Sequence, residues 1–416
     1  MRTRLLPRSA VLGGVAGGLA LAISNVIIWI TRGPLGLLND FYVYWSAAAV
    51  LNQGGNPYDG TALARVHDAA GVPGLLGGGY SYPLLFAQVL RPLALLPAPA
   101  AGAIFMVLSV LAVALAVAVL LGSAPRLSVA AAIPIGMLGG LFPPVSYGLW
   151  NGQANDILLP FLALAFRGLE PGANLALATA VKLYPATGFL ALLGRRDWLR
   201  QVGLAAVLIG VPFAAAEVAV PGGTGSAGAR VAGLLAPDPY WSNESINGFL
   251  SRLAIAPGPL RGLPVVPVDL VLIGALAATT VAVLWRCRFR PWEGALSLSI
   301  WLGCVAAPKN SLWNFAPMLL CLAYGVLRMR SQPRLALALL LAPWLMGLQL
   351  LLWAVNFENG TVPDSAYANP AVVWLTSAVG LYTGLMVGFV NARLLLLERP
   401  APATAKNLAA AATAGP

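Results

Sequence analysis

Charged residues are scarce in this sequence: Asp, Glu, Lys and Arg make up only 9% of its 416 residues. An ordinary soluble domain has about 25%, so the scarcity excludes a soluble globular protein. Hydrophobic residues reach 59% and the mean hydropathy is +0.80, which predicts an all-α polytopic membrane protein. A net charge of +11 would suggest a nucleic-acid partner for a soluble chain. We expect no nucleic acid here, because the positions of the basic residues explain the charge better.

Cysteine and histidine are also rare. The three cysteines do not form a C-x-x-C pair, and the single histidine, His67, which we expect in a solvated loop, excludes most zinc sites. The sequence also lacks a Gly-rich phosphate loop and a paired-acid motif for a metal and a nucleoside diphosphate. We therefore expect no disulfide framework, no metal centre and no cofactor.

Long apolar runs are abundant, and they predict about 10–12 transmembrane helices. Runs of spanning length lie at 10–30, 99–122, 128–149, 154–167, 201–219, 264–285, 293–307, 312–327, 333–354 and 370–392. Another run, 173–194, is interrupted at Lys182-Leu-Tyr-Pro185, which predicts two short helices that meet near Lys182. The first run follows three arginines, as in a signal peptide, but it is long enough to span and no clear cleavage site follows. We therefore expect a retained first helix.

The basic residues cluster on one side of this predicted topology. With a cytoplasmic N-terminus, 17 of the 25 Lys and Arg residues fall in cytoplasmic segments, as the positive-inside rule requires. Both termini are then cytoplasmic, and the long polar segments 31–98 and 220–263 lie outside the cytoplasmic membrane. We expect one transmembrane domain, 1–398, a disordered cytoplasmic tail, 399–416, and a functional site at the outer face.

The first outer segment contains an acid at the head of a predicted helix. Asp40 follows the first apolar run, and the apolar residues of 40–52 recur at helical spacing, which predicts a helix lying along the membrane surface. An acid there would be within reach of a lipid-borne substrate. It could equally be an N-cap, a role that Asp fills well. A second interfacial element is expected at 80–97.

The other polar residues near the outer face each have two interpretations. Lys182 either lines a cavity or snorkels to the surface, and Lys309 is either a phosphate ligand or an interface anchor. Arg252, with Asn243 and Asn247 nearby, could hold a phosphate or could be a solvated loop residue. The residues between two predicted spans either recognise hydroxyl groups or serve as turn and capping residues; they are Asn151, Gln153 and Asn155.

Six short motifs follow one another around this hydrophobic pattern. They are N-D-F-Y-V-Y (39–44), N-P-Y-D (56–59), Y-S-Y-P (80–83), N-G-Q-A-N-D (151–156), V-K-L-Y-P (181–185) and N-E-S-I-N-G-F-L-S-R-L (243–253). In this order, over roughly residues 10–395, the sequence resembles glycosyltransferase family 87. These are polyprenyl-phosphate-sugar-dependent enzymes with the GT-C membrane fold, and they include mycobacterial phosphatidylinositol-mannoside mannosyltransferases and arabinofuranosyltransferases.

The resemblance implies a role for each motif. The acid after the first span, here Asp40, corresponds to the catalytic base, and Lys182 corresponds to the lysine of V-K-L-Y-P. Lys182, Arg252 and Lys309 are the candidates for binding the donor phosphate. The motifs and nearby polar residues also supply candidate substrate-binding residues: Tyr44, Asp59, Tyr82, Asn151, Gln153, Asn155, Tyr184, Asn243 and Asn247. Asp59 is also the alternative base, although it lies in a turn where an acid is expected anyway.

The sequence departs from the family at one motif. The family often has S-P-x-S-W-x-H-H before a late span, whereas this chain has A-P-K-N-S-L-W-N-F at 307–315. The missing histidine pair leaves the sugar open, so arabinofuranose and glucose stand beside mannose as the transferred sugar.

The resemblance predicts an inverting membrane glycosyltransferase that uses a polyprenyl-phosphate sugar and a glycolipid or glycan acceptor among the membrane lipids. We expect it to be a monomer. A transporter or flippase of a lipid-linked sugar is the alternative. The absence of an internal repeat and the concentration of polar residues at one face argue against transport. A non-catalytic scaffold in envelope assembly is a third, weaker alternative.

Overall fold

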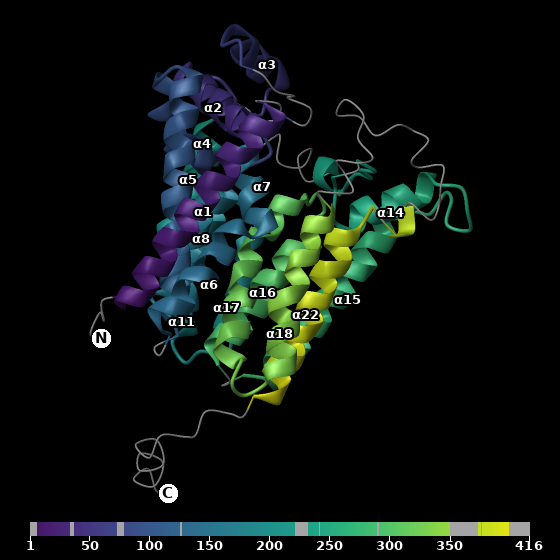
Figure 1. Ribbon diagram of the computed structural model, residues 1–416. Helices are drawn as coiled ribbons and strands as arrows, with labels where there is room; N and C mark the ends of the chain where they lie inside the picture. The colour runs from purple at the N-terminus through teal and green to yellow at the C-terminus, as the bar shows by residue number, and fades with distance from the viewer. Residues whose placement is uncertain are drawn as a thin grey trace, which may run out of the picture.

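The computed structural model describes residues 6–33, 37–72, 79–124, 127–220, 232–240, 242–288, 291–349, 373–375 and 377–398. Helices dominate these residues, and none of them lies in a strand (Figure 1). The all-α polytopic architecture expected from the sequence is therefore confirmed. The tail predicted at 399–416 lies outside the described residues.

Five helical segments of the described chain are long and apolar enough to cross a membrane. They are α1 (Arg8–Arg32), α5 (Ala98–Leu121), the continuous run through α11 (Trp198–Ala205), η3 (Ala206–Gly210) and α12 (Val211–Ala219), α15 (Val265–Arg286), and the segment ending in α22 (Val379–Leu397). A sixth is possible if the pair α6 (Val129–Leu141) and α7 (Pro143–Asn151) counts as one span. This pair is bent by 50°, where two prolines follow Phe142.

Shorter apolar helices account for the other predicted spans. The runs at 154–167, 293–307, 312–327 and 333–354 correspond to α8 (Asn155–Phe166), α16 (Trp292–Ala306), η4 (Leu312–Met318) with α17 (Leu319–Arg328), and α18 (Pro333–Leu341) with η5 (Ala342–Leu345). A helix of 12 residues, such as α8, rises only about 18 Å and is shorter than a hydrocarbon core of about 30 Å. Among the described residues, the number of full spans by length is therefore lower than the sequence predicted.

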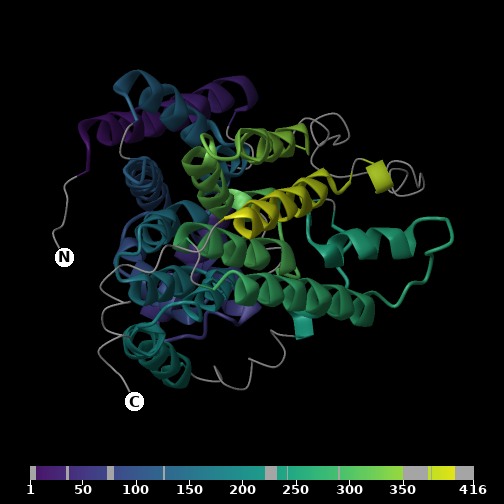
Figure 2. The ribbon, with the colours of Figure 1, turned by 90° about the horizontal axis from the view of Figure 1, so that it is seen from below.

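The surface of α1 shows which side faces lipid. Between Val11 and Ile30 its exposed residues are all apolar and recur along one side of the helix; they are Val11, Val15, Leu19, Ile23, Val26, Ile27, Trp29 and Ile30. On another face, α1 packs very closely on α6, where a Cβ added to Gly140 would lie 2.0 Å from the carbonyl oxygen of Gly17. Figure 2 shows α1, in purple, at the edge of the bundle. An apolar outer stripe and a glycine-lined inner face are typical of a transmembrane helix.

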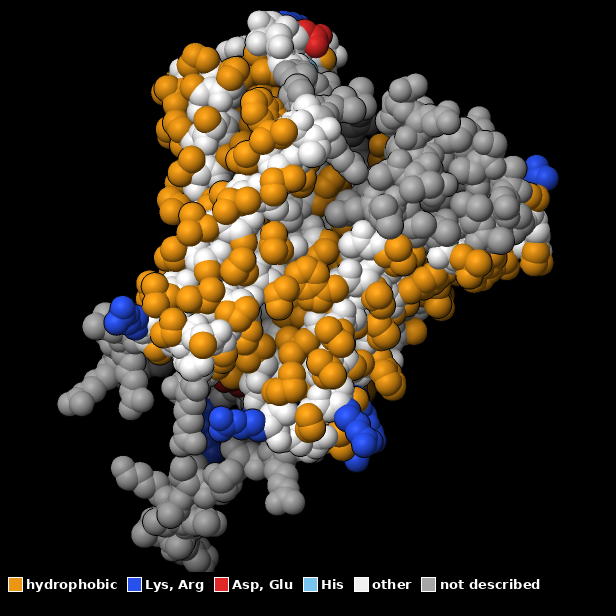
Figure 3. Space-filling view, viewed as in Figure 1, with side chains coloured by type: hydrophobic (Ala, Val, Ile, Leu, Met, Phe, Trp, Pro, Cys, Tyr) orange, Lys and Arg blue, Asp and Glu red, His pale blue; other side chains and the backbone are white. Residues whose placement is uncertain are grey.

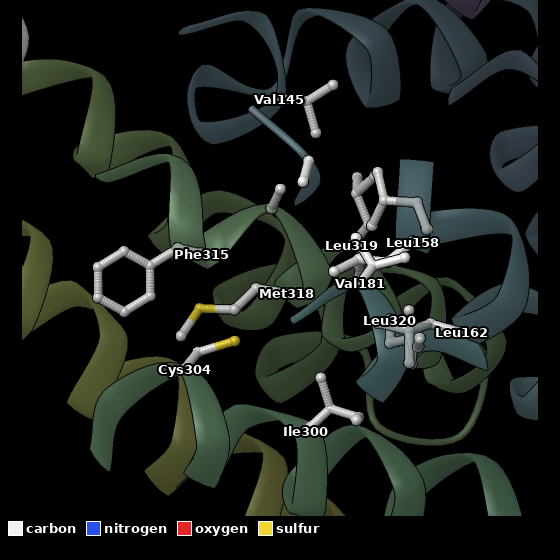
Figure 4. Close-up of a cluster of buried hydrophobic side chains, with 14 of the residues drawn as sticks. Val145, Leu158, Leu162, Val181, Ile300, Cys304, Phe315, Met318, Leu319 and Leu320 are labelled. Carbon is white, nitrogen blue, oxygen red and sulfur yellow. The ribbon is translucent and has the colours of Figure 1, made fainter. Parts of the chain in front are cut away.

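The two halves of the chain meet in a shared hydrophobic core. Val145, Leu158 and Val181 from α7, α8 and α9 (Pro171–Val181) lie in one cluster with Ile300, Cys304, Phe315, Met318, Leu319 and Leu320 from α16, η4 and α17 (Figure 4). All three cysteines are buried as free thiols. This core holds the helices that supply the polar site described below in fixed positions.

The segment that the sequence predicts to lie outside folds into short helices that pack on one another: α2 (Asn39–Asn52), α3 (Gly60–Ala69), α4 (Leu84–Leu90) and η1 (Leu93–Leu95). The predicted helix at 40–52 is present as α2, but residues 41–51 are buried all round rather than on one face, because α3, α4, η1 and α5 contact it. The expected solvated position of His67 is wrong. It lies buried in α3, with Nδ1 3.5 Å from Ser46 Oγ.

Charge is segregated on the molecular surface. In Figure 3 most of the blue Lys and Arg side chains lie toward the lower end of the bundle, below a broad hydrophobic band, with others at the top and at the right edge. Figure 1 shows the start of α1 and the end of α22 toward that lower end. The first outer segment, with α2 and α3, lies at the opposite end (Figure 1). Asp40 is therefore on the side away from the arginine-rich end.

Candidate active site

Asp40 lies in the first turn of α2 but does not cap it. The N-cap residue is Leu38, with a left-handed φ of 60°, and no side chain caps this helix. The amide of Leu38 donates to the carbonyl oxygen of Trp150 at 2.9 Å, which attaches the start of α2 to the end of α7. The N-cap interpretation of Asp40 is thus wrong, and its half-buried carboxylate instead accepts a hydrogen bond from Nε2 of Gln153.

Gln153 reaches Asp40 because a glycine precedes it. Gly152 ends α7 with φ +68°, and a Cβ there would lie 2.7 Å from Cβ of Phe41. The amide of Gln153 closes the turn by donating to the carbonyl oxygen of Gly148 at 2.9 Å. A residue without a side chain is needed here for both reasons, the left-handed backbone and the contact with α2.

Gly152→Ala is expected to destabilise the fold by about 1–3 kcal/mol, from overpacking against Phe41 and from the left-handed backbone. Thermal unfolding in detergent should show a lower midpoint, because Gln153 and the start of α2 are pushed apart. Gly54→Ala is a suitable control. Gly54 also has a positive φ, +73°, but has open space where the Cβ would be, so its loss should be smaller. Equal midpoints for the two variants would contradict the close contact at Gly152.

Lys182 points into the same site. It ends α9 in extended backbone, at the predicted break before η2 (Tyr184–Gly188). Its Nζ donates to Gln153 Oε1 at 3.2 Å and to Asn314 Oδ1 at 2.6 Å, and it lies 4.9 Å from the centre of the Tyr82 ring. The ammonium group is therefore held by protein groups inside the site and does not snorkel to the surface.

Two tyrosines complete the environment of Gln153. Tyr44 lies one turn after Asp40 on the same face of α2, and its hydroxyl donates to the Tyr82 hydroxyl at 2.7 Å. Both hydroxyls lie close to Gln153 Oε1, at 3.3 Å from Tyr44 and 3.2 Å from Tyr82. One amide side chain thus joins the carboxylate, the ammonium group and both phenols.

The network continues through two asparagines to a third tyrosine. Asn155 accepts from the Tyr184 hydroxyl at 3.0 Å and donates to Asn314 Oδ1 at 3.0 Å and to the carbonyl oxygen of Trp313 at 3.0 Å. Sequence reasoning missed Asn314 as a site residue. The available signal was the departure at 307–315, where Trp-Asn stands in the region of the expected histidines.

The residues of this network differ in exposure, and those that keep accessible surface are called its rim. Tyr44, Gln153, Asn155 and Asn314 are buried. Asp40, Tyr82, Lys182 and Tyr184 keep part of their surface accessible. The accessible rim therefore combines one carboxylate, one ammonium group and two phenols, and these are groups that can contact a polar ligand.

The carboxyl group of Asp40 is tuned for proton transfer near neutral pH. Burial raises the pKa of Asp40 to about 6, although the positive charge of Lys182 and the hydrogen bond from Gln153 oppose the rise. A carboxylate with this pKa is mostly ionised at pH 7 and still binds a proton more readily than an ordinary aspartate. These are the properties of a general base.

Two of the predicted residues have local structural roles outside this network. Asp59 is the N-cap of α3, and its Oδ1 accepts from the amides of Thr61 at 2.9 Å and Ala62 at 3.3 Å. Asn151 donates to the carbonyl oxygen of Tyr147 in its own helix at 2.9 Å. The turn or capping role that the sequence left open for Asn151 fits this residue, and Asp59 lies in the turn where an acid was expected.

The remaining predicted residues belong to a second polar cluster around α14 (Ile246–Ile255). Arg252 is fully buried there, and its guanidinium donates to Ser377 and to the carbonyl oxygens of Tyr240 and Asn243. The solvated position considered for Arg252 is therefore wrong, and its nitrogens are already engaged by protein groups.

The neighbours of Arg252 are similarly engaged. Asn247 donates to Asp269 at 3.3 Å, Asn243 accepts from the amide of Asn310 at 3.0 Å, and Lys309 forms an ion pair with Asp238 at 3.7 Å. Across the described ranges, no group of three or more His, Cys, Asp or Glu residues could hold a metal ion.

The sequence that forms these helices, the break at Lys182 and the buried amide network was compared with models of known protein families. The model of glycosyltransferase family 87 matches residues 80–308, more than half of the chain. The chain belongs to this family. It is thus a membrane glycosyltransferase, which uses a sugar donor and an acceptor. No curated protein and no solved structure matches the chain.

The family match covers only part of the site. Tyr82, Gln153, Asn155, Lys182 and Tyr184 lie within residues 80–308, whereas Asp40, Tyr44 and Asn314 lie outside them. The assignment of Asp40 to the site of this glycosyltransferase therefore rests on its contact with Gln153.

Proposed function

We propose that this glycosyltransferase moves mannose from a polyprenyl-phosphate donor to a hydroxyl group of a glycolipid or glycan, with inversion at the anomeric carbon. The observation that carries the proposal is that the side chain of Gln153 bonds to both Asp40 and Lys182. Both charged groups are partly accessible at the rim of one buried network. Inverting transfer from a lipid phosphate needs one base for the acceptor and one cation for the departing phosphate.

The reaction follows from these two charges. The Asp40 carboxylate accepts the proton of the acceptor hydroxyl as the oxygen forms a bond to the anomeric carbon on the face opposite the phosphate. The bond between this carbon and the phosphate oxygen breaks, and polyprenyl phosphate leaves with the electron pair. Lys182 is the cation best placed to stabilise the charge that develops on the phosphate. Gln153 and Asn314 orient its ammonium group.

We further propose that the enzyme lies in the cytoplasmic membrane with both termini inside and the site outside. The arginine-rich end of the bundle supports the orientation through the positive-inside rule (Figure 3). A site at the opposite end is open to a donor that arrives laterally in the outer leaflet. We expect the enzyme to act as a monomer.

The pH dependence of transfer should report the protonation of Asp40. Only the ionised carboxylate is a base, so kcat should rise with pH through a midpoint near 6, the pKa of Asp40. An ordinary aspartate would move that midpoint to about 4. The measurement is a profile of single-turnover rate from pH 4.5 to 8.5 with saturating donor. A rate that is flat across this range would contradict general-base catalysis by Asp40.

Transfer in detergent separates this proposal from transport of a lipid-linked sugar. An enzyme joins labelled sugar to an acceptor in a single compartment without any gradient, and a transporter does not. Purified protein in micelles should therefore convert labelled polyprenyl-phosphate mannose into glycosylated acceptor. Donor movement across sealed vesicles, with no product in micelles, would support the transporter instead. Polyprenyl-phosphate arabinofuranose and glucose, tested in parallel, decide the sugar.

A further inference from the structure

The second polar cluster is hydrogen-bonded to the backbone that leads into η4. Its residues 242–245 contact residues 63–69 positions further along the chain. The amide of Asn310 donates to Asn243 Oδ1 at 3.0 Å, and the carbonyl oxygen of Asn310 accepts from the amide of Glu244. The hydroxyl of Ser245 lies 2.8 Å from the carbonyl oxygen of Pro308. Both backbone polar groups of Asn310 are therefore held by the 242–245 segment.

Burial fixes the orientation of these groups. Asn243, Ser245 and Asn310 are all buried. Asn243 Oδ1 also accepts from the amide of Ser245 at 3.2 Å, and Nδ2 of Asn310 donates to the carbonyl oxygen of Cys304 in α16. A Cβ added to Gly248 would lie 2.6 Å from Cγ of Asn243, so α14 packs directly on this side chain. Buried side chains that are hydrogen-bonded in this way hold the segments they join in one arrangement.

One helical turn connects this contact with Lys182. Ser311 is the N-cap residue of η4, and its carbonyl oxygen accepts from the amide of Asn314 at 2.8 Å. Asn314 Oδ1 then accepts from Lys182 Nζ at 2.6 Å. Asn155 holds the Asn314 carboxamide from the side of α8. The 242–245 segment holds the backbone from which the same carboxamide projects, so the position of the lysine's partner depends on both.

We infer that Asn243 and Ser245 are positioning residues for sugar transfer, which hold the start of η4 so that Asn314 orients the ammonium group of Lys182. Both are buried in the second polar cluster, so they act through Asn314 and not by contact with a substrate. The inference rests on the role proposed above for Lys182 at the departing phosphate. It gives the 243–253 motif a part in the reaction although its side chains are engaged by protein groups.

Hydrogen–deuterium exchange of the purified full-length protein tests the structural step without any substrate. Asn243→Ala removes the acceptor of the Asn310 amide, so exchange should rise in peptides that cover 308–318. Ser251→Ala is the matched control, because Ser251 is equally buried in α14 but bonds within its own helix and to the amide of Asp238. Exchange over 308–318 should stay at the wild-type level in this control. Equal exchange there in the two variants would overturn the inference.

A double-mutant cycle on kcat tests whether Asn243 acts through Asn314. Asn243→Ala should lower kcat by up to about 10²-fold, the cost of a misplaced catalytic group, with little change in KM for the donor. In the Asn314→Ala background the same substitution should change kcat little, because the residue through which it acts is already missing. A merely structural role would lower kcat by the same factor in both backgrounds, and that result would overturn the inference.

Two further variants keep the outcome interpretable. If Asn243→Ala does not fold, Ser245→Ala takes its place in both measurements, since it removes the hydroxyl next to Pro308. Lys182→Met, assayed in parallel, separates this inference from the proposed function. A full loss at Lys182 with additive effects of Asn243 and Asn314 would overturn the positioning role alone. Wild-type kcat in Lys182→Met would overturn the proposed role of Lys182, and the positioning role with it.

Discussion

Replacing Asp40 by asparagine is expected to lower the rate of sugar transfer by about 10²–10⁴-fold, the usual contribution of a general base. Asparagine has nearly the same shape and can still accept a hydrogen bond from Gln153, so the Gln153–Lys182 contact should persist. What is lost is the ability to take the proton of the acceptor hydroxyl. Because the substitution spares binding, the loss should appear in kcat rather than in KM for the donor.

Asp59→Asn is the matched control for this variant. Asp59 lies in the same outer segment, but its carboxylate caps α3, and asparagine is an equally good N-cap. Its transfer rate should therefore stay close to that of the wild type. A large loss at Asp59 with little loss at Asp40 would assign the base to Asp59, the alternative that the sequence left open.

Lys182→Met is expected to cost about 10²–10³-fold in kcat, the typical effect of removing one group that stabilises developing negative charge. Methionine keeps the length of the apolar stem and removes only the charge and its hydrogen bonds. The variant should also move the pH profile. Since the charge of Lys182 lowers the pKa of Asp40, its removal should shift the midpoint of the profile upward from about 6.

Lys309→Met separates a specific role of Lys182 from a general loss of positive charge. Lys309 is 43% exposed and pairs with Asp238 outside the Asp40 network. The variant should therefore lose much less activity and keep the midpoint of the wild-type profile. A purely structural role for Lys182 would lower the thermal unfolding midpoint without moving the pH profile, and that result would contradict the electrostatic role.

The sequence predicted the site where a local signal was strong. A lysine followed by Leu-Tyr-Pro in an apolar run indicates a broken helix, because proline lacks an amide hydrogen and a buried cation needs partners. The structure confirms this break at Lys182. The helix predicted at 40–52 is also present, as α2. Its signal was local too, since its apolar residues recur at helical spacing.

The sequence could not predict the contacts that depend on distant segments. Asn314 lies 132 positions from Lys182 and 159 from Asn155, and a single sequence carries no signal for such a pairing. The solvated-loop alternative for Arg252 rested on the general rule that loops lie on the surface. Its burial depends on Ser377, which is 125 positions away. Likewise, the helical spacing of 40–52 could not show that α3, α4 and α5 would cover α2 on every side.

The central claim is that the Asp40–Gln153–Lys182 site transfers a sugar from a lipid phosphate. The most direct measurement supplies the purified protein with labelled polyprenyl-phosphate mannose or, separately, labelled GDP-mannose, together with an extract of native lipids. The account predicts labelled product from the lipid donor alone and little product with Asp40→Asn. Product from GDP-mannose alone, or none from the mannose, arabinofuranose and glucose forms of the lipid donor, would contradict it.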